Sequence, residues 1–114
     1  YTCADLDTWI PSSPVDIVHS MEVAYYLKDP FAFLQNVYNS WLIKGGVLIL
    51  GLDFYKENAV SHSWPEDCGV SIMHLFSEKH WIELFRKAGF KEVESTRFGI
   101  KENWSGTLIL KGQK

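Results

Sequence analysis

The chain has 114 residues, enough for one domain with a hydrophobic core but too few for two. Hydrophobic residues make up 46% of it and aromatic residues 15%, which excludes a disordered chain. The formal net charge of −3 argues against a nucleic-acid partner bound through phosphate neutralisation.

Membrane and metal-binding signals are also missing from the sequence. No apolar run approaches the roughly 20 residues that a membrane span requires, so we expect no membrane partner. Cys3 and Cys68 have neither CxxC nor zinc-finger spacing. We therefore expect a cytoplasmic protein in which both thiols are reduced.

The first half of the chain predicts a strand, a helix and a second strand. Residues 1–14 are loop-like, with Trp9-Ile10 as a buried anchor. Val15–Ser20 is an expected strand, and Pro30–Lys44 is an expected helix with one apolar stripe, begun by Asp29 and ended by Gly45. The all-apolar run Val47–Leu50 is typical of a strand buried on both faces. A strand–helix–strand unit makes the two strands parallel.

The second half predicts a long loop, a helix and an antiparallel strand pair. Residues 51–76 are irregular, and a connection of this length is usually a binding loop or lid. Ser77 caps a helix that ends at Gly89, with Trp81, Leu84, Phe85 and Ala88 on its buried face. Strands are expected at residues 90–98 and 107–110, and the short connection between them requires antiparallel pairing.

This order of elements resembles the second half of a class I S-adenosylmethionine-dependent methyltransferase, and most closely its small-molecule branch. The resemblance rests on four stretches taken together: Asp16–Val18, Glu22–Pro30, Leu42–Ile49 and Lys87–Phe90. It implies an α/β fold: a partial Rossmann-like sheet of two parallel strands plus an antiparallel C-terminal pair, with flanking helices.

The resemblance also assigns residues to S-adenosylmethionine, the implied cofactor. Asp5 is placed to accept a hydrogen bond from the adenine amino group, and Leu6 to offer its backbone N–H to the ring. Ser20 and Met21 follow the fourth strand of the family sheet, where backbone groups hold the methionine portion. Tyr26 falls where many relatives carry a histidine, so a general base at that position is not expected.

Other parts of the family's cofactor pocket have no counterpart in this sequence. The chain contains no GxGxxG or GxG turn, and it enters what resembles the middle of a fold soon after Tyr1. We therefore interpret residues 1–114 as a single partial methyltransferase domain that lacks the N-terminal cofactor-binding strands. Alone, it is expected to be inactive and to bind S-adenosylmethionine weakly or not at all.

Two residues are candidates for acid–base chemistry on a methyl acceptor. Methyl transfer from a sulfonium is a direct displacement that needs alignment above all, and a base assists when the acceptor is a hydroxyl or an ammonium. Glu22 is the first candidate, the alternative being a solvated turn residue, and His74 is the second, the alternative being a structural imidazole.

Aromatic and histidine residues leave further alternatives open. Tyr25 and Tyr26 could face the sulfonium, or one of them could pack on the following helix. Phe54, Tyr55 and Trp64 could close over a flat substrate or anchor their loop to the core. His62, Cys68, His74 and His80 recur every six residues, a spacing that fits no common metal motif, so no metal is expected.

The sequence thus predicts methyl transfer from S-adenosylmethionine to a small-molecule acceptor. The main alternative is a non-catalytic interaction module that uses the open edge of the first strand to complete a partner's sheet or to form a dimer. A nicotinamide-binding Rossmann half is a weaker third interpretation, because the antiparallel last pair suits methyltransferases better.

Overall fold

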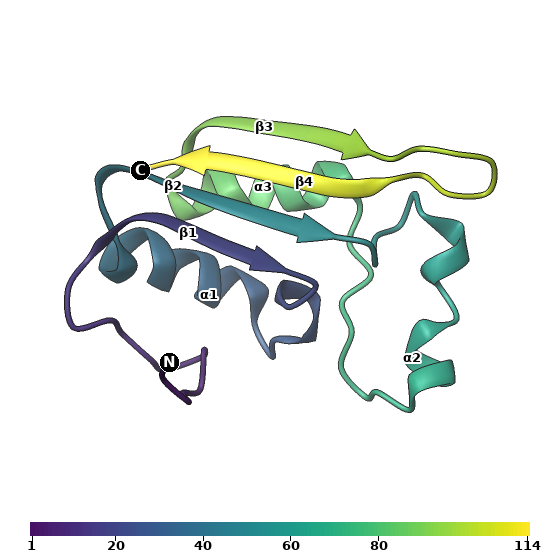
Figure 1. Ribbon diagram of the computed structural model, residues 1–114, viewed down its shortest axis with the longest axis horizontal. Coiled ribbons are helices and arrows are strands. Elements are labelled where there is room, and N and C mark those ends of the chain that lie inside the picture. Colours follow the sequence, from purple (N-terminus) through teal and green to yellow (C-terminus); the bar gives the residue numbers. More distant parts are fainter.

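A four-stranded mixed sheet organises the chain, and the computed structural model describes all of its residues, 1–114 (Figure 1). The strands are β1 (Val15–Met21), β2 (Leu42–Leu52), β3 (Lys91–Phe98) and β4 (Thr107–Gln113). Their order is β1-β2-β4-β3, with β1 and β2 parallel and the other two pairings antiparallel. The predicted α/β fold class is confirmed.

The helices α1 and α3 contact each other and pack on one face of this sheet. None of the helices is long and apolar enough to cross a membrane. The helical elements are η1 (Ala24–Tyr26), α1 (Pro30–Asn36), the π-helical η2 (Val37–Trp41), η3 (Ala59–Ser61), α2 (Trp64–Cys68) and α3 (Glu78–Ala88).

The first long helix ends earlier than predicted. Asp29 caps α1 as expected, because its Oδ1 accepts a hydrogen bond of 3.0 Å from the Ala32 backbone N–H. The helical conformation stops at Trp41, however, and β2 begins at Leu42. Gly45 has the expected positive φ of +82°, but it lies inside β2 at an irregularity of the β1–β2 register. Helical periodicity did not reveal that the buried Leu42 starts the strand.

The second long helix follows its prediction closely. Ser77 Oγ accepts a hydrogen bond of 3.1 Å from the His80 backbone N–H, and Gly89, at φ +113°, ends α3. Trp81 and Phe85 are buried against the sheet, whereas Leu84 is only half-buried. The preceding residues 51–76 are not wholly irregular as predicted, since they contain η3 and α2.

The sheet has one covered face and one open face. Alternate residues of β2, such as Leu48 and Leu50, are fully buried beneath α1 and α3. Val47 and Ile49 point to the opposite side and are only half-buried. The prediction of a strand buried on both faces is therefore wrong for these 114 residues.

The N-terminal segment is anchored by one of the two predicted residues. Trp9 meets Trp41 edge to face with 5.0 Å between ring centroids, and Trp41 Nε1 donates a hydrogen bond of 3.1 Å to the Trp9 carbonyl. Ile10 is 57% exposed, so its predicted burial is wrong.

Candidate functional site

Glu22 fastens the carboxyl end of β1 to the carboxyl end of β2. Its backbone N–H donates to the Gly51 carbonyl over 2.9 Å. Its Oε1 accepts from the Asp53 backbone N–H and its Oε2 from the Tyr25 hydroxyl, each over 2.6 Å. Glu22 also has a φ of +56°, a left-handed conformation that costs a non-glycine residue free energy. A strained acidic residue at this sheet edge is a candidate functional group.

Burial and neighbouring charge control the protonation of this cluster. Burial raises the pKa of Glu22, and the charge of Asp53 raises it further, while the hydrogen bonds from Tyr25 and Asp53 oppose the rise. Burial also raises the pKa of Tyr25, and its hydrogen bond to Glu22 adds to this effect. Tyr25 therefore stays protonated at physiological pH and keeps donating to the carboxylate.

Asp53 is a candidate that sequence analysis did not identify. It follows β2 directly, as Glu22 follows β1, and its side-chain Oδ1 is buried without a hydrogen-bond donor. A buried acceptor without a donor costs free energy, and an unsatisfied group of this kind marks Asp53 as a candidate. The sequence contained a signal for Asp53. The carboxyl ends of parallel strands lie at one edge of a sheet, so a polar residue directly after the second strand is a candidate for the same reason as one after Val15–Ser20.

His74 ties the loop after β2 to the turn after β1. Its backbone N–H donates to the Tyr25 carbonyl over 2.8 Å, and its ring Nε2 lies 2.9 Å from the Leu27 carbonyl. Since a carbonyl only accepts, Nε2 carries the proton and Nδ1 is left as the acceptor nitrogen. The ring thus has one anchored donor, and its Nδ1 makes no hydrogen bond within the protein.

The aromatic residues of this region pack in a connected row. Ring centroids are 4.5 Å apart for Tyr25 and Tyr26, 5.4 Å for Tyr25 and Phe54, and 6.5 Å for Phe54 and Trp64. Phe54 and Tyr55 are buried in the core, as the anchoring alternative expects, whereas Tyr26 is 40% exposed. Tyr26 is thus the ring of this row most open to a ligand.

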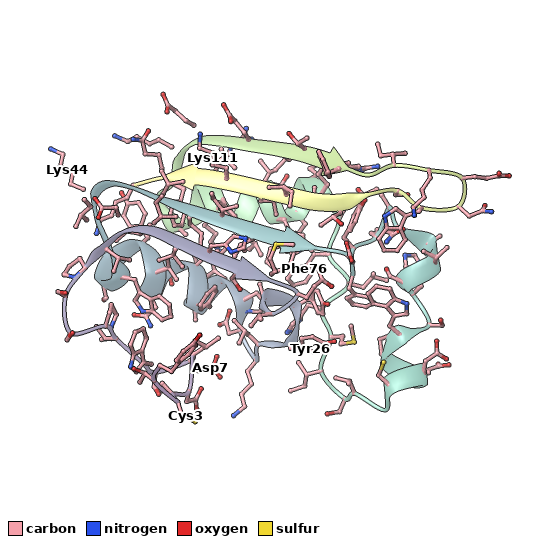
Figure 2. All side chains as sticks on the ribbon, in the orientation of Figure 1. Cys3, Asp7, Tyr26, Lys44, Phe76 and Lys111 are labelled. Atoms are coloured by element: carbon pink, nitrogen blue, oxygen red, sulfur yellow. The ribbon has the colours of Figure 1, made fainter.

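The residues assigned to the cofactor lie in two groups. Asp5 and Leu6 belong to the N-terminal segment, where Asp5 Oδ1 accepts a 3.0 Å hydrogen bond from the Asp7 backbone N–H. Ser20, Met21 and Tyr26 lie at the carboxyl end of β1, and Figure 2 shows Tyr26 there and Asp7 on the N-terminal segment. No hydrogen bond joins the two groups.

Residues of both groups have accessible atoms. Asp5 is exposed and keeps its Oδ2 as a free acceptor, and Leu6 is half-buried against the core. Met21 is 40% exposed and lies across Gly51, where only the missing side chain of a glycine leaves room.

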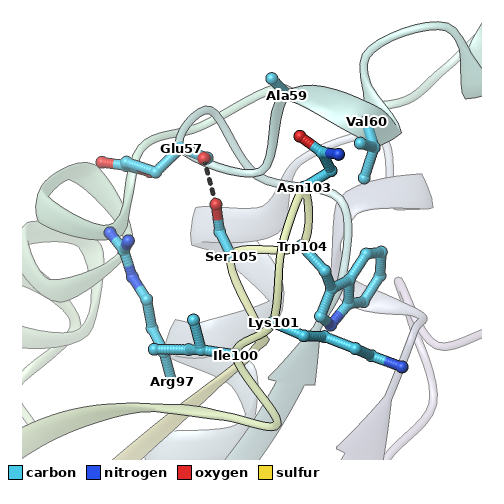
Figure 3. A pocket seen from close by; sticks show the side chains of 9 residues that line it. All are labelled: Glu57, Ala59, Val60, Arg97, Ile100, Lys101, Asn103, Trp104 and Ser105. Atoms are coloured by element: carbon cyan, nitrogen blue, oxygen red, sulfur yellow. Dashed lines mark hydrogen bonds between the residues drawn. The ribbon is translucent and has the colours of Figure 1, made fainter.

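The cavities of this structure lie elsewhere. One, of about 350 Å³, is formed by the β3–β4 hairpin and η3 (Figure 3), and another, of about 340 Å³, lies beside α3. None of the predicted site residues lines either cavity. No group of three or more histidine, cysteine, aspartate or glutamate side chains is placed to hold a metal ion.

No protein-family model and no curated protein sequence matches the chain. Solved structures do match. The complex between the Trm112 methyltransferase activator of Haloferax volcanii and its methyltransferase partner matches with a TM-score of 0.79 and 27% identity, over 96% of this chain and 59% of that one.

A second match is an S-adenosylmethionine-dependent methyltransferase of Thermotoga maritima, described as a possible histamine N-methyltransferase. Its TM-score is 0.82 at 19% identity, over 97% of this chain and 62% of that one. The N-methyltransferase NodS of Bradyrhizobium japonicum, solved with S-adenosyl-L-homocysteine, has a TM-score of 0.69 at 19% identity, over 96% and 51% of the two chains.

The fold is therefore that of part of the class I S-adenosylmethionine-dependent methyltransferases. The chain spans about three fifths of the length of the first two of these structures. The predicted resemblance is confirmed at the level of the fold.

Proposed function

We propose that this chain is the carboxyl-terminal part of a domain that transfers a methyl group from S-adenosylmethionine to a small-molecule acceptor. The observation that carries the proposal is the clustering of Glu22, Tyr25, Asp53 and His74 at the carboxyl ends of β1 and β2, in a fold shared with part of known methyltransferases. Ligands bind at this edge of open α/β sheets.

Cofactor binding is assigned to residues on both sides of this edge. Asp5 Oδ2 would accept from the adenine amino group, with the Leu6 backbone N–H beside it. Ser20, Met21 and Tyr26 would contact the methionine portion, and the exposed ring of Tyr26 would face the sulfonium. Such contacts hold the donor in line with the acceptor, which is the main catalytic requirement of a direct displacement.

Acid–base assistance is assigned to His74, and a supporting role to Glu22. His74 Nδ1 can take a proton from the acceptor while Nε2 remains bonded to the Leu27 carbonyl. Both oxygens of Glu22 already accept hydrogen bonds, so Glu22 would act by orienting Tyr25 and by its negative charge near the acceptor. Asp53 Oδ1 would accept from an N–H or O–H of the bound molecule.

The open edge of β1 supports the partial-domain interpretation. β1 pairs with β2 alone, and Ile17 on that strand is 61% exposed. Unpaired strand edges attract further strands, so we assign the missing cofactor-binding strands to this edge.

A cytoplasmic location with Cys3 and Cys68 reduced stays a prediction; both cysteines are free and exposed.

The same open edge favours one other function. A non-catalytic module could pair β1 with a partner's strand, or with β1 of a second copy in a dimer. Gel filtration with mass detection separates the two proposals. A monomeric full-length protein supports the enzyme, and an obligate complex formed through β1 supports the module.

Calorimetric titration of S-adenosylmethionine into the full-length protein tests the proposed function. We expect saturable binding that Asp5→Asn weakens about tenfold by removing a charged acceptor, while the neighbouring Asp7→Asn leaves it unchanged. The 114-residue chain alone should bind weakly or not at all. Micromolar binding by this chain alone would refute the partial-domain interpretation, and no binding by the full-length protein would refute the enzymatic one.

A further inference from the structure

Trp104 is the one tryptophan without a place in the hydrophobic core. The other four either belong to the core or pack against it, and each stacks on or meets the edge of another aromatic ring. Trp104 is half-buried, pairs with no aromatic ring and lines the cavity of about 350 Å³. An indole outside the core that lines a cavity together with the exposed Ile100 and Val60 indicates a binding role.

This cavity, here called the hairpin cavity, is lined by residues of two segments, 57–60 and 97–105 (Figure 3). Hydrogen bonds hold the two segments together. Asn58 is fully buried between them: its Nδ2 donates to the Asp53 carbonyl over 2.8 Å, and its Oδ1 accepts from the Ser105 backbone N–H over 3.2 Å. Ser105 Oγ donates to the Glu57 carbonyl over 2.7 Å. Tyr55 adds a bond of 2.8 Å to the Gly106 carbonyl. The cavity is therefore preformed and need not be ordered by its ligand.

The walls of the hairpin cavity are apolar around the indole. Ile100 is 66% exposed and Val60 is 44% exposed, and both line the cavity together with Trp104. Exposed branched side chains beside an indole offer a flat molecule contacts on its faces and edges. The volume lies at the lower end of the range for small-molecule sites, about 300–1,000 Å³.

The charges of the cavity leave one free cation. Arg97 Nη2 lies 2.7 Å from Glu78 Oε2, so its charge is compensated. Glu57 Oε2 accepts from the Glu78 backbone N–H over 3.1 Å, and its carboxylate points away from Trp104 (Figure 3). Lys101 belongs to neither ion pair of the structure. A ligand with one negative charge would compensate Lys101.

We propose that the hairpin cavity is a second ligand site, which binds a planar aromatic molecule carrying one negative charge. The ring stacks on Trp104 between Ile100 and Val60, and the anionic group meets the ammonium of Lys101. None of the residues assigned to cofactor or acceptor lines this cavity, so the proposal does not depend on methyl transfer.

Calorimetric titration of the full-length protein with 2-naphthoate and its neutral analogue 2-naphthalenemethanol tests the proposal. Both should bind, the anion more tightly. Trp104→Ala should weaken both about tenfold by removing the stacking surface. Lys101→Gln should weaken the anion alone by about threefold, in the range of an exposed ion pair. The control Phe98→Ala removes an exposed ring of β3 that does not line the cavity, and it should change neither affinity.

Nuclear magnetic resonance keeps the proposal testable if Trp104→Ala fails to fold. In the wild-type protein, nuclear Overhauser effects should connect naphthyl protons to the methyl groups of Ile100 and Val60. Absence of saturable binding at millimolar 2-naphthoate would overturn the proposal. Equal affinity of wild type and a folded Trp104→Ala, or contacts confined to other methyl groups, would overturn it as well.

Discussion

Glu22 has a strained backbone conformation, and both oxygens of its carboxylate accept hydrogen bonds. Its left-handed φ of +56° lets the chain turn sharply after β1, and its two oxygens hold Tyr25 and Asp53. The clamp offsets the strain, and it fixes the edge at which the proposed ligands bind. One side chain thus positions both Tyr25 and Asp53.

Tyr25→Phe tests this clamp. The substitution removes the donor to Glu22 Oε2 and leaves a half-buried carboxylate oxygen without its partner. We expect the free energy of unfolding in urea to fall by about 1–2 kcal/mol. Tyr38→Phe, at a half-buried tyrosine whose hydroxyl makes no hydrogen bond within the protein, is the control and should change stability little. Equal stability of wild type and Tyr25→Phe would show that the clamp contributes nothing.

Only part of this site could be predicted from the sequence. Glu22 and His74 stand out because they are polar residues next to a strand end and a loop end. The partners of Glu22 depend on the pairing of β1 with β2, which brings Asp53 within hydrogen-bond distance across 31 positions. The predicted parallel pairing already places Asp53 at this edge, but no local pattern shows which atoms form hydrogen bonds there, and the anchoring of His74 to Leu27 was hidden for the same reason.

At the scale of elements, helix-capping residues were the sequence signals that predicted the structure best. Cap residues placed both long helices, since Asp29 and Ser77 accept the backbone hydrogen bonds that the caps require. The end of α1 was missed because Leu42 continues the apolar stripe of the helix while sheet pairing draws it into β2. Tertiary pairing overrode a helical pattern there.

Two glycines of the sheet should respond differently to an added methyl group. A Cβ on Gly112 would lie 2.8 Å from Phe85 and 2.9 Å from Phe90, two rings held in the core. Gly112→Ala should therefore lower the free energy of unfolding by about 1–3 kcal/mol. Gly51→Ala displaces only the flexible Met21 on the open face and should cost less than about 1 kcal/mol. Urea unfolding compares the two, and a reversed order would contradict the packing described for α3.

The link between α3 and β3 should depend on pH. Burial alone would raise the pKa of Glu78, but hydrogen bonds from Ser95 and Arg97 and the charge of Arg97 outweigh it and lower the pKa. A carboxylate whose pKa is lower in the folded than in the unfolded state stabilises the fold at pH values above its ordinary pKa of 4.5. This stability is lost as the pH falls through the lowered pKa.

Glu78→Gln should therefore destabilise the protein at about pH 7 and have a much smaller effect at about pH 3. Urea unfolding at both pH values measures the difference from wild type. Glu83→Gln removes an exposed carboxylate of the same helix, 3.9 Å from Lys79, and should have little effect at either pH. A difference for Glu78→Gln that does not change with pH would contradict the pKa assignment.

At the scale of the molecule, the sheet is covered on one face and open along β1. Two of the three strand pairings could be predicted, because crossover handedness and loop lengths restrict how consecutive strands pair, but the place of β4 rather than β3 beside β2 could not. The number of buried faces could not be predicted, because a short apolar run such as that of β2 is compatible with a strand covered on one face or on both. Val47 and Ile49, which are only half-buried, show that one face of β2 is covered and the other is not. The matched structures are longer than this chain and share its sheet.

We propose that the carboxyl edge of β1 and β2 faces the methyl donor. Ultraviolet photolabelling of the full-length protein with S-adenosylmethionine tritiated in its methyl group, followed by peptide mapping, tests this claim directly. We expect the label at residues 20–26, with excess S-adenosyl-L-homocysteine abolishing it. Label that is absent, or that falls only on peptides remote from this edge, would show that this edge does not hold the methyl donor.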